Sequence, residues 1–134
     1  MPIYSIDREN ESGIPELAYK FKRILADADG IVLSLAEHNS SFSAAYKNVF
    51  DWTSRIDRAV FGNNPLLLLA TSPGGRGGKT VLETATAAYT RMNENVVVPF
   101  SLPSFSQNFS QEGIQNEELN NEFKAALDDF VAAL

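Results

Sequence analysis

The 134-residue chain suits a single domain, and its formal net charge of −6 argues against nucleic-acid and anionic membrane partners, which both call for a basic patch. The absence of cysteine and the single histidine exclude disulfides, a thiol nucleophile and a histidine or cysteine metal site. No apolar run is long enough to cross a membrane and no signal-peptide pattern is present, so we expect a cytoplasmic protein.

Stretches with apolar residues at helical spacing alternate with short apolar runs along the whole chain. The first kind of pattern is typical of a helix with one buried face, and the second of a buried strand. The predicted elements, in chain order, are a helix over 14–28, a strand over 31–35, a helix over 43–56, a strand over 65–71, a helix over 78–92, a strand over 95–98 that Pro99 is expected to end, a polar loop over 100–115 and a last helix from about residue 117.

This alternation of helices and strands is typical of a parallel sheet with helices on both of its faces. The segment 65–71 supports that prediction, because an apolar residue at nearly every position is typical of a strand buried on both sides. Three strands are few for such a sheet. We therefore expect the chain to begin in the middle of a fold.

The predicted helix over 43–56 is apolar on two sides, and helices of that kind usually bury both sides. Two interpretations stay open. The helix either turns a wide apolar face to the core or forms a subunit interface, where aromatic residues are enriched. The second interpretation predicts a homodimer or homotetramer joined through this helix. One side carries Ala45, Val49, Trp52 and Ile56, and the other carries Tyr46 and Phe50.

The segment 66–79 runs from an apolar strand into a loop with four glycines and then into a helix-compatible stretch. Open α/β sheets bind ligands at such turns, because backbone without side chains can approach a ligand closely. Residues 77–80 also match the end of a phosphate-binding P-loop. Pro73 stands where that motif needs its first glycine, and proline offers no N–H. A nucleotide-phosphate binder using residues 74–80 is therefore the less favoured alternative.

Three short motifs carry a resemblance to a known family. Residues 36–39 read Ala-Glu-His-Asn, residues 47–52 read Lys-Asn-Val-Phe-Asp-Trp, and residues 72–78 read Ser-Pro-Gly-Gly-Arg-Gly-Gly. In this order they resemble the Pro-Glu-Tyr-Asn, Lys-Asn-x-x-Asp-Trp and Ser-x-Gly-Gly-x-Gly-Gly motifs of the NAD(P)H-dependent FMN reductase family of flavodoxin-like proteins. Ala36 and His38 depart from the first motif. The resemblance implies a flavodoxin-like three-layer α/β/α domain over residues 1–134.

The resemblance also implies an activity and a binding site. The activity is hydride transfer from NAD(P)H, the co-substrate, through bound FMN to flavin or quinone acceptors. The cofactor carries out this chemistry, so no side chain need act as a nucleophile or general base and no metal is required. Backbone N–H groups, the Asn39 amide and the Ser72 hydroxyl would line the flavin. The implied FMN-binding residues are Glu37, His38, Asn39, Ser72, Gly74, Gly75, Arg76, Gly77 and Gly78.

The start of the chain departs from the family pattern. Members of the family begin with a strand, a phosphate-holding loop of the Gly-Ser-x-Arg-x-x-Ser kind, a helix and a second strand, and nothing here corresponds to them. We therefore expect an amino-terminally truncated, partial domain with about three strands and an exposed sheet edge that a dimer or a partner must cover. We expect weak or absent reductase activity from the isolated chain. The alternative is a non-enzymatic remnant or interaction module of the same fold with little or no flavin binding.

Overall fold

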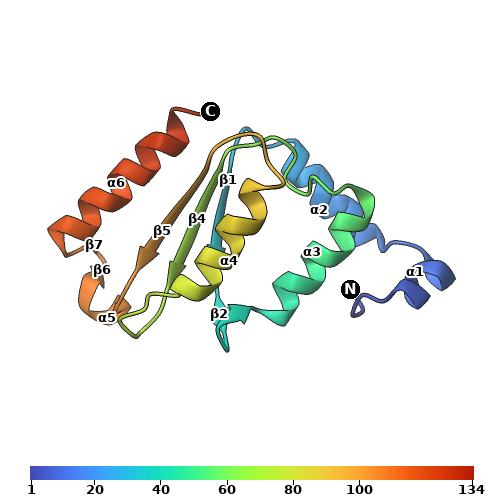
Figure 1. Cartoon of the computed structure of the whole chain (residues 1–134), viewed down its shortest axis with the longest axis horizontal. Helices are drawn as coiled ribbons and strands as arrows, with labels where there is room; N and C mark the ends of the chain where they lie inside the picture. The colour runs from blue at the N-terminus through green and yellow to red at the C-terminus, as the bar shows by residue number, and fades with distance from the viewer.

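Three parallel strands form the centre of the molecule in a computed structural model that describes all 134 residues (Figure 1). They are β1 (Ile31–Leu35), β4 (Leu66–Thr71) and β5 (Val97–Leu102), and the order across the sheet is β1-β4-β5. The apolar run of β4 is therefore the central strand, as its sequence predicts, and β1 and β5 are the two outer strands.

Helices cover both faces of this sheet, which confirms the predicted three-layer α/β/α architecture (Figure 1). One face is covered by α2 (Glu16–Ala26), α3 (Ala44–Ile56) and α4 (Lys79–Thr90), and the other by α6 (Glu117–Val131). Two helices begin at a polar residue that caps them. The side chains of Ser43 and Asn116 accept hydrogen bonds from backbone N–H groups in the first turns of α3 and α6.

The two layers enclose two separate hydrophobic cores. Leu66 and Leu68 of β4 belong to the core under α2, α3 and α4, whereas Leu67 belongs to the core under α6. Successive side chains of a strand point to opposite faces, so a strand that serves both cores must be apolar at every position. This requirement explains the run of four leucines.

Tyr46 and Tyr89 lie in an aromatic cluster between α3 and α4, and their hydroxyl oxygens are 2.6 Å apart in a shared hydrogen bond. Burial raises the pKa of Tyr89 to about 12. Burial, together with the neighbouring Tyr89, also raises the pKa of Tyr46 well above its ordinary value. Each hydroxyl satisfies the other in a site that water does not reach freely, so the pair behaves as one structural unit.

An amino-terminal segment that the sequence does not predict covers the second side of α3. A short helix, α1 (Ile6–Ser12), follows Pro2 and Tyr4, which lie against α3. The Tyr4 N–H donates to Asn48 Oδ1 at 2.9 Å, and the Trp52 indole donates to the Pro2 carbonyl at 2.8 Å. Trp52 is only 1% exposed. The chain itself thus buries much of both apolar sides of α3, and a subunit interface there stays a prediction.

The expectation that Pro99 ends the third strand is wrong, because Pro99 lies inside β5 in register with Leu68. The Leu66 N–H donates to the Val96 carbonyl at 2.9 Å, and residues of a parallel ladder alternate in facing the partner strand. The Pro99 nitrogen therefore faces away from β4. On the open side of an outer strand a missing N–H breaks no ladder hydrogen bond, so proline is tolerated.

Two segments outside the predicted helices and strands contain small elements. The serine-rich turn after β1 is a hairpin of β2 (Glu37–His38) and β3 (Ser41–Phe42). The polar loop expected over 100–115 begins with the end of β5 and continues through α5 (Phe105–Asn108), then a hairpin of β6 (Phe109–Ser110) and β7 (Gly113–Ile114). Runs of two residues are too short to show a period of two, so their sequences carry no strand signal.

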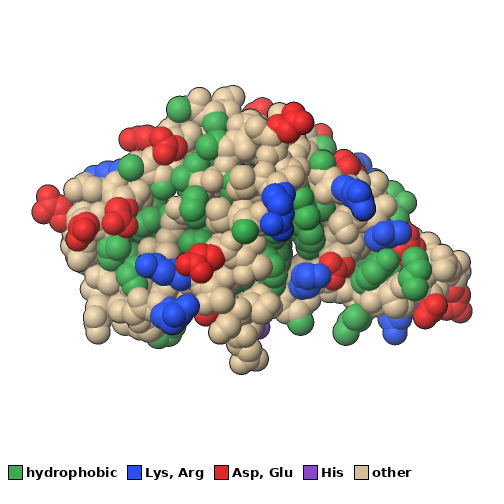
Figure 2. All heavy atoms as spheres, in the orientation of Figure 1, with side chains coloured by type: hydrophobic (Ala, Val, Ile, Leu, Met, Phe, Trp, Pro, Cys, Tyr) green, Lys and Arg blue, Asp and Glu red, His purple; other side chains and the backbone are tan.

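Figure 2 shows acidic side chains grouped over α6 and over α1, with lysine and arginine side chains spread between them on the visible face. None of the helices is both long enough and apolar enough to cross a membrane.

Candidate functional site

The predicted site residues come together at the carboxyl ends of β1 and β4, in the hairpin 37–42 and the glycine loop 72–78. Parallel strands deliver the residues that follow them to one edge of the sheet, which is where α/β sheets bind ligands. The segment after β5 anchors the glycine loop by donating hydrogen bonds to carbonyl groups of the loop. The Ser104 N–H donates to the Gly74 carbonyl at 2.9 Å, and the Phe105 N–H to the Ser72 carbonyl at 3.0 Å.

The N–H groups of the glycine loop stay largely free. The Gly77 N–H donates to the Gly74 carbonyl at 3.2 Å, whereas the N–H groups of Gly74, Gly75, Arg76 and Gly78 have no acceptor within the chain. Successive free N–H groups in a turn form a concave set of donors that suits an anion or the carbonyl-rich edge of a ligand. The loop is thus held by its carbonyls and open through its donors.

Gly77 and Gly78 are required by the fold of the loop itself. Both have a positive φ, +60° and +72°, which other residues adopt only with strain. A Cβ on Gly77 would overlap Ser101 Oγ and lie 2.9 Å from the Pro103 nitrogen. Ser101 Oγ also donates to the Gly77 carbonyl at 2.9 Å, which fixes the loop against β5. The role of these two glycines is to let two backbone segments approach each other.

Gly74 and Gly75 differ from that pair. Neither has a positive φ, and a Cβ at either position would meet no atom within 4 Å. Nothing inside the chain therefore requires glycine at these two positions. The space beside their free N–H groups is open to a ligand. Backbone without side chains allows the ring system of a ligand to approach closely.

The two polar side chains of the glycine loop have partners in or beside it. Ser72 Oγ donates to the Gly74 carbonyl at 3.1 Å and keeps its acceptor lone pairs for another group. The Arg76 guanidinium donates to Thr80 Oγ1 at 3.0 Å on the exposed side of the first turn of α4. This contact holds one positive charge next to the free donors.

The hairpin presents a second set of donors. Asn39 and Ser40 form its turn with φ values of 50° and 63°, the pattern of a two-residue type I′ turn. The N–H groups of both residues have no acceptor within the chain, and the Asn39 amide makes no hydrogen bond. His38 is exposed beside them. The predicted Asn39 and its neighbour Ser40, which the sequence does not single out, are thus free to bind.

The Glu37 carboxylate does not point freely into the site. Its Oε2 accepts a hydrogen bond at 3.0 Å from the N–H of Val81, in the first turn of α4. That helix begins after Gly78, which has no side chain with which to cap it. Sequence reasoning misses this contact because 44 residues separate the two groups. The signal that was available is a helix preceded by two glycines and no capping residue.

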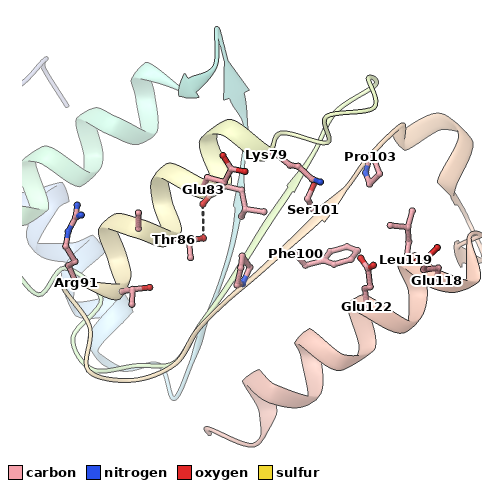
Figure 3. A pocket seen from close by; sticks show the side chains of 14 residues that line it. Lys79, Glu83, Thr86, Arg91, Phe100, Ser101, Pro103, Glu118, Leu119 and Glu122 are labelled. Carbon is pink, nitrogen blue, oxygen red and sulfur yellow. Dashed lines mark hydrogen bonds between the residues drawn. The ribbon is translucent and has the colours of Figure 1, made fainter.

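Figure 3 shows a groove of about 930 Å³ that runs along β5 between α4 and α6. Lys79 and Glu83 of α4 and Glu122 of α6 are among the residues that line it. It includes none of the nine predicted flavin-binding residues, although Ser101, which lines it, donates a hydrogen bond to Gly77 of the glycine loop. No group of three or more acidic or histidine side chains lies close enough to hold a metal ion.

Comparison with known proteins agrees with this architecture. The family model for NADPH-dependent FMN reductase matches residues 1–109. The 2-hydroxy-1,4-benzoquinone reductase of a Burkholderia species is 38% identical over 78 residues, which are 58% of this chain and 42% of that protein. The NADPH azoreductase of Bacillus sp. (strain OY1-2) is 31% identical over 97 residues, 72% of this chain and 52% of that protein. The chain therefore spans about two fifths to one half of these relatives.

A solved structure supports the fold independently. The flavoenzyme NAD(P)H:(acceptor) oxidoreductase FerB from Paracoccus denitrificans superimposes with a TM-score of 0.73 at 20% identity, covering 99% of this chain and 74% of that one. The fold is accordingly that of flavodoxin-like flavoenzymes. Since the family model covers most of its residues, the chain belongs to the NADPH-dependent FMN reductase family.

Proposed function

We propose that this chain is an FMN reductase-like flavoprotein, in which hydride passes from NAD(P)H through bound FMN to flavin or quinone acceptors. The observation that carries the proposal is the pair of free donor sets, one on Gly74, Gly75, Arg76 and Gly78 and one at the turn of the β2–β3 hairpin. Bound FMN supplies the hydride chemistry. One relative, named as a 2-hydroxy-1,4-benzoquinone reductase, supports a quinone acceptor.

The residues of the chain bind and tune rather than react. The free N–H groups of the glycine loop would donate to the oxygen- and nitrogen-bearing edge of the flavin ring. Donors already in place stabilise the negative charge that such a ring gains on reduction. The Asn39 N–H and side-chain amide would donate from the hairpin. Arg76, held by Thr80, would favour the same negative charge or the phosphates of the nicotinamide nucleotide.

A partial domain and an oligomer belong to the proposal as well. β1 is an outer strand, and its Val32 side chain is 56% exposed, which supports a further element over that face of the sheet. Val49 and Ile56 of α3 are only half-buried, which supports a homodimer or homotetramer through this helix. Light scattering of the purified chain tests the oligomer, and a monomer at micromolar concentration contradicts it. The expected cytoplasmic location is tested by cell fractionation.

A flavin titration of the purified chain tests the central proposal, with FMN and riboflavin compared side by side by fluorescence quenching. The two flavins share the ring but not the phosphate. We expect weak binding of equal strength, because in this proposal both donor sets bind the ring and neither binds the phosphate. Much tighter binding of FMN would mean that these residues also hold the phosphate. Binding of neither flavin would overturn the proposal in favour of a non-enzymatic interaction module.

A further inference from the structure

The Glu37 carboxylate links the two loops of the candidate site. It is half-buried, it forms no ion pair with lysine, arginine or histidine, and it accepts its hydrogen bond from the backbone of Val81. The hairpin that carries it contributes a donor set at its turn. The helix that it contacts follows directly on the glycine loop. One side chain thus joins both walls of the site.

The contact has the chemistry of a helix cap delivered from a distant segment. Lys79 and Leu82 use the carbonyls of Arg76 and Gly78 as acceptors, but the Val81 N–H has no acceptor in its own loop. This third N–H of a helix is the one that a capping side chain usually accepts from. A carboxylate is favoured there, since the start of a helix carries partial positive charge and the hydrogen bond is charge-assisted.

The hairpin depends on such an anchor for its position. Its ladder has two residue pairs, Glu37 with Phe42 and His38 with Ser41, and a two-stranded hairpin has little stability by itself. Contacts between β3 and α4 place it beside that helix. The Glu37 bond adds a directional link at the open end of the hairpin, at the start of the strand that leads into its turn.

We infer that Glu37 is a positioning residue, whose carboxylate fixes the turn at Asn39 relative to Gly74 and Gly75 so that both donor sets reach one ligand together. The identity of that ligand, the flavin ring, rests on the function proposed above. The inference differs from the role that the family resemblance implies, in which Glu37 lies along the flavin. In our inference the Glu37 side chain does not contact the flavin. It holds the hairpin in place through its hydrogen bond with the Val81 N–H at the start of α4.

Three variants and two measurements test this inference. Glu37→Ala removes the acceptor, Glu37→Gln keeps an oxygen that can accept from Val81, and Glu83→Ala is the matched control. Glu83 is an exposed acid of α4, the helix that Glu37 contacts, and its side chain makes no hydrogen bond or ion pair. The first measurement is amide hydrogen exchange at Val81 without ligand, and the second is the FMN titration.

We expect Glu37→Ala to speed exchange at Val81 at least about tenfold and to weaken FMN binding about tenfold, the effect of losing one charge-assisted bond. Glu37→Gln should restore both to within about threefold, and Glu83→Ala should match the wild type. Unchanged FMN affinity in Glu37→Ala overturns the inference and leaves the proposed function standing. If the wild type binds no flavin, the proposed function fails, and exchange at Val81 still decides whether Glu37 holds the hairpin. A tenfold loss in Glu37→Gln also overturns it, even if Glu37→Ala does not fold.

Discussion

Substitutions in the glycine loop should separate residues that hold the loop from residues that face the ligand. Gly77→Ala places a methyl group on a residue with a φ of +60°, against Ser101 Oγ and the backbone of Pro103. The strained backbone costs about 1–2 kcal/mol and the overlap about 1–3 kcal/mol. We therefore expect a loss of about 2–5 kcal/mol in the free energy of unfolding, measured in urea through the fluorescence of Trp52, the single tryptophan.

Gly62→Ala is the matched control, because Gly62 has a φ of +62° but no atom within 4 Å of the added Cβ. It should cost only the backbone strain of about 1–2 kcal/mol. Gly75→Val should leave the free energy of unfolding within about 1 kcal/mol of the wild type, since the side chain enters open space, yet weaken FMN binding at least about tenfold. Equal destabilisation by Gly77→Ala and Gly62→Ala would refute the overlap, and wild-type FMN affinity in Gly75→Val would refute the placement of the site.

The buried tyrosine pair, the amino-terminal segment and a surface ion pair give further predictions. Tyr46→Phe and Tyr89→Phe should each lower the free energy of unfolding by about 1–2 kcal/mol, and the double variant by less than their total, in urea titrations. Because burial raises the pKa of Tyr89 from 10.0 to about 12, the folded protein keeps a proton that the unfolded chain loses. Stability should therefore fall as the pH rises from about 10 to 12, with a shallower slope in the double variant. Asn48→Ala should release the amino-terminal segment, cost about 1–3 kcal/mol and shift the emission of Trp52 to longer wavelength. Lys47→Ala should change the free energy of unfolding by less than about 0.5 kcal/mol, because its ion pair is exposed.

The sequence predicts the layers of the fold well, because periodicity reports directly on burial. The leucine run of β4 and the apolar stripe of α6 each have one explanation in an α/β protein. Pro99 misleads for a physical reason. Proline forbids a hydrogen bond on one side of a strand, and only the position of that strand at the edge of the sheet tells which side is empty. The local sequence does not determine the order of the strands in the sheet.

The sequence predicts the candidate site as a pair of loops, but it does not predict the separate roles of the residues within them. All four glycines of residues 74–78 look equivalent in sequence, whereas the structure gives Gly77 a packing role and leaves Gly75 in open space. The link from Glu37 to Val81 joins residues far apart in the chain, so no local pattern encodes it. The amino-terminal segment, which docks on α3 through Asn48, is hidden for the same reason.

The two outer strands of the sheet have unequal consequences for assembly. A strand that tried to pair with the free side of β5 would find the nitrogen of Pro99 where it needs a donor, so growth on that side is interrupted. β1 contains no proline and no charged residue, and it offers a complete row of peptide groups. Growth of this sheet by addition of strands is therefore open only at β1. If two copies of the chain paired through β1, the two outer edges of the joined sheet would both be β5 strands interrupted by Pro99. Such an assembly would stop at a pair instead of extending into a fibre.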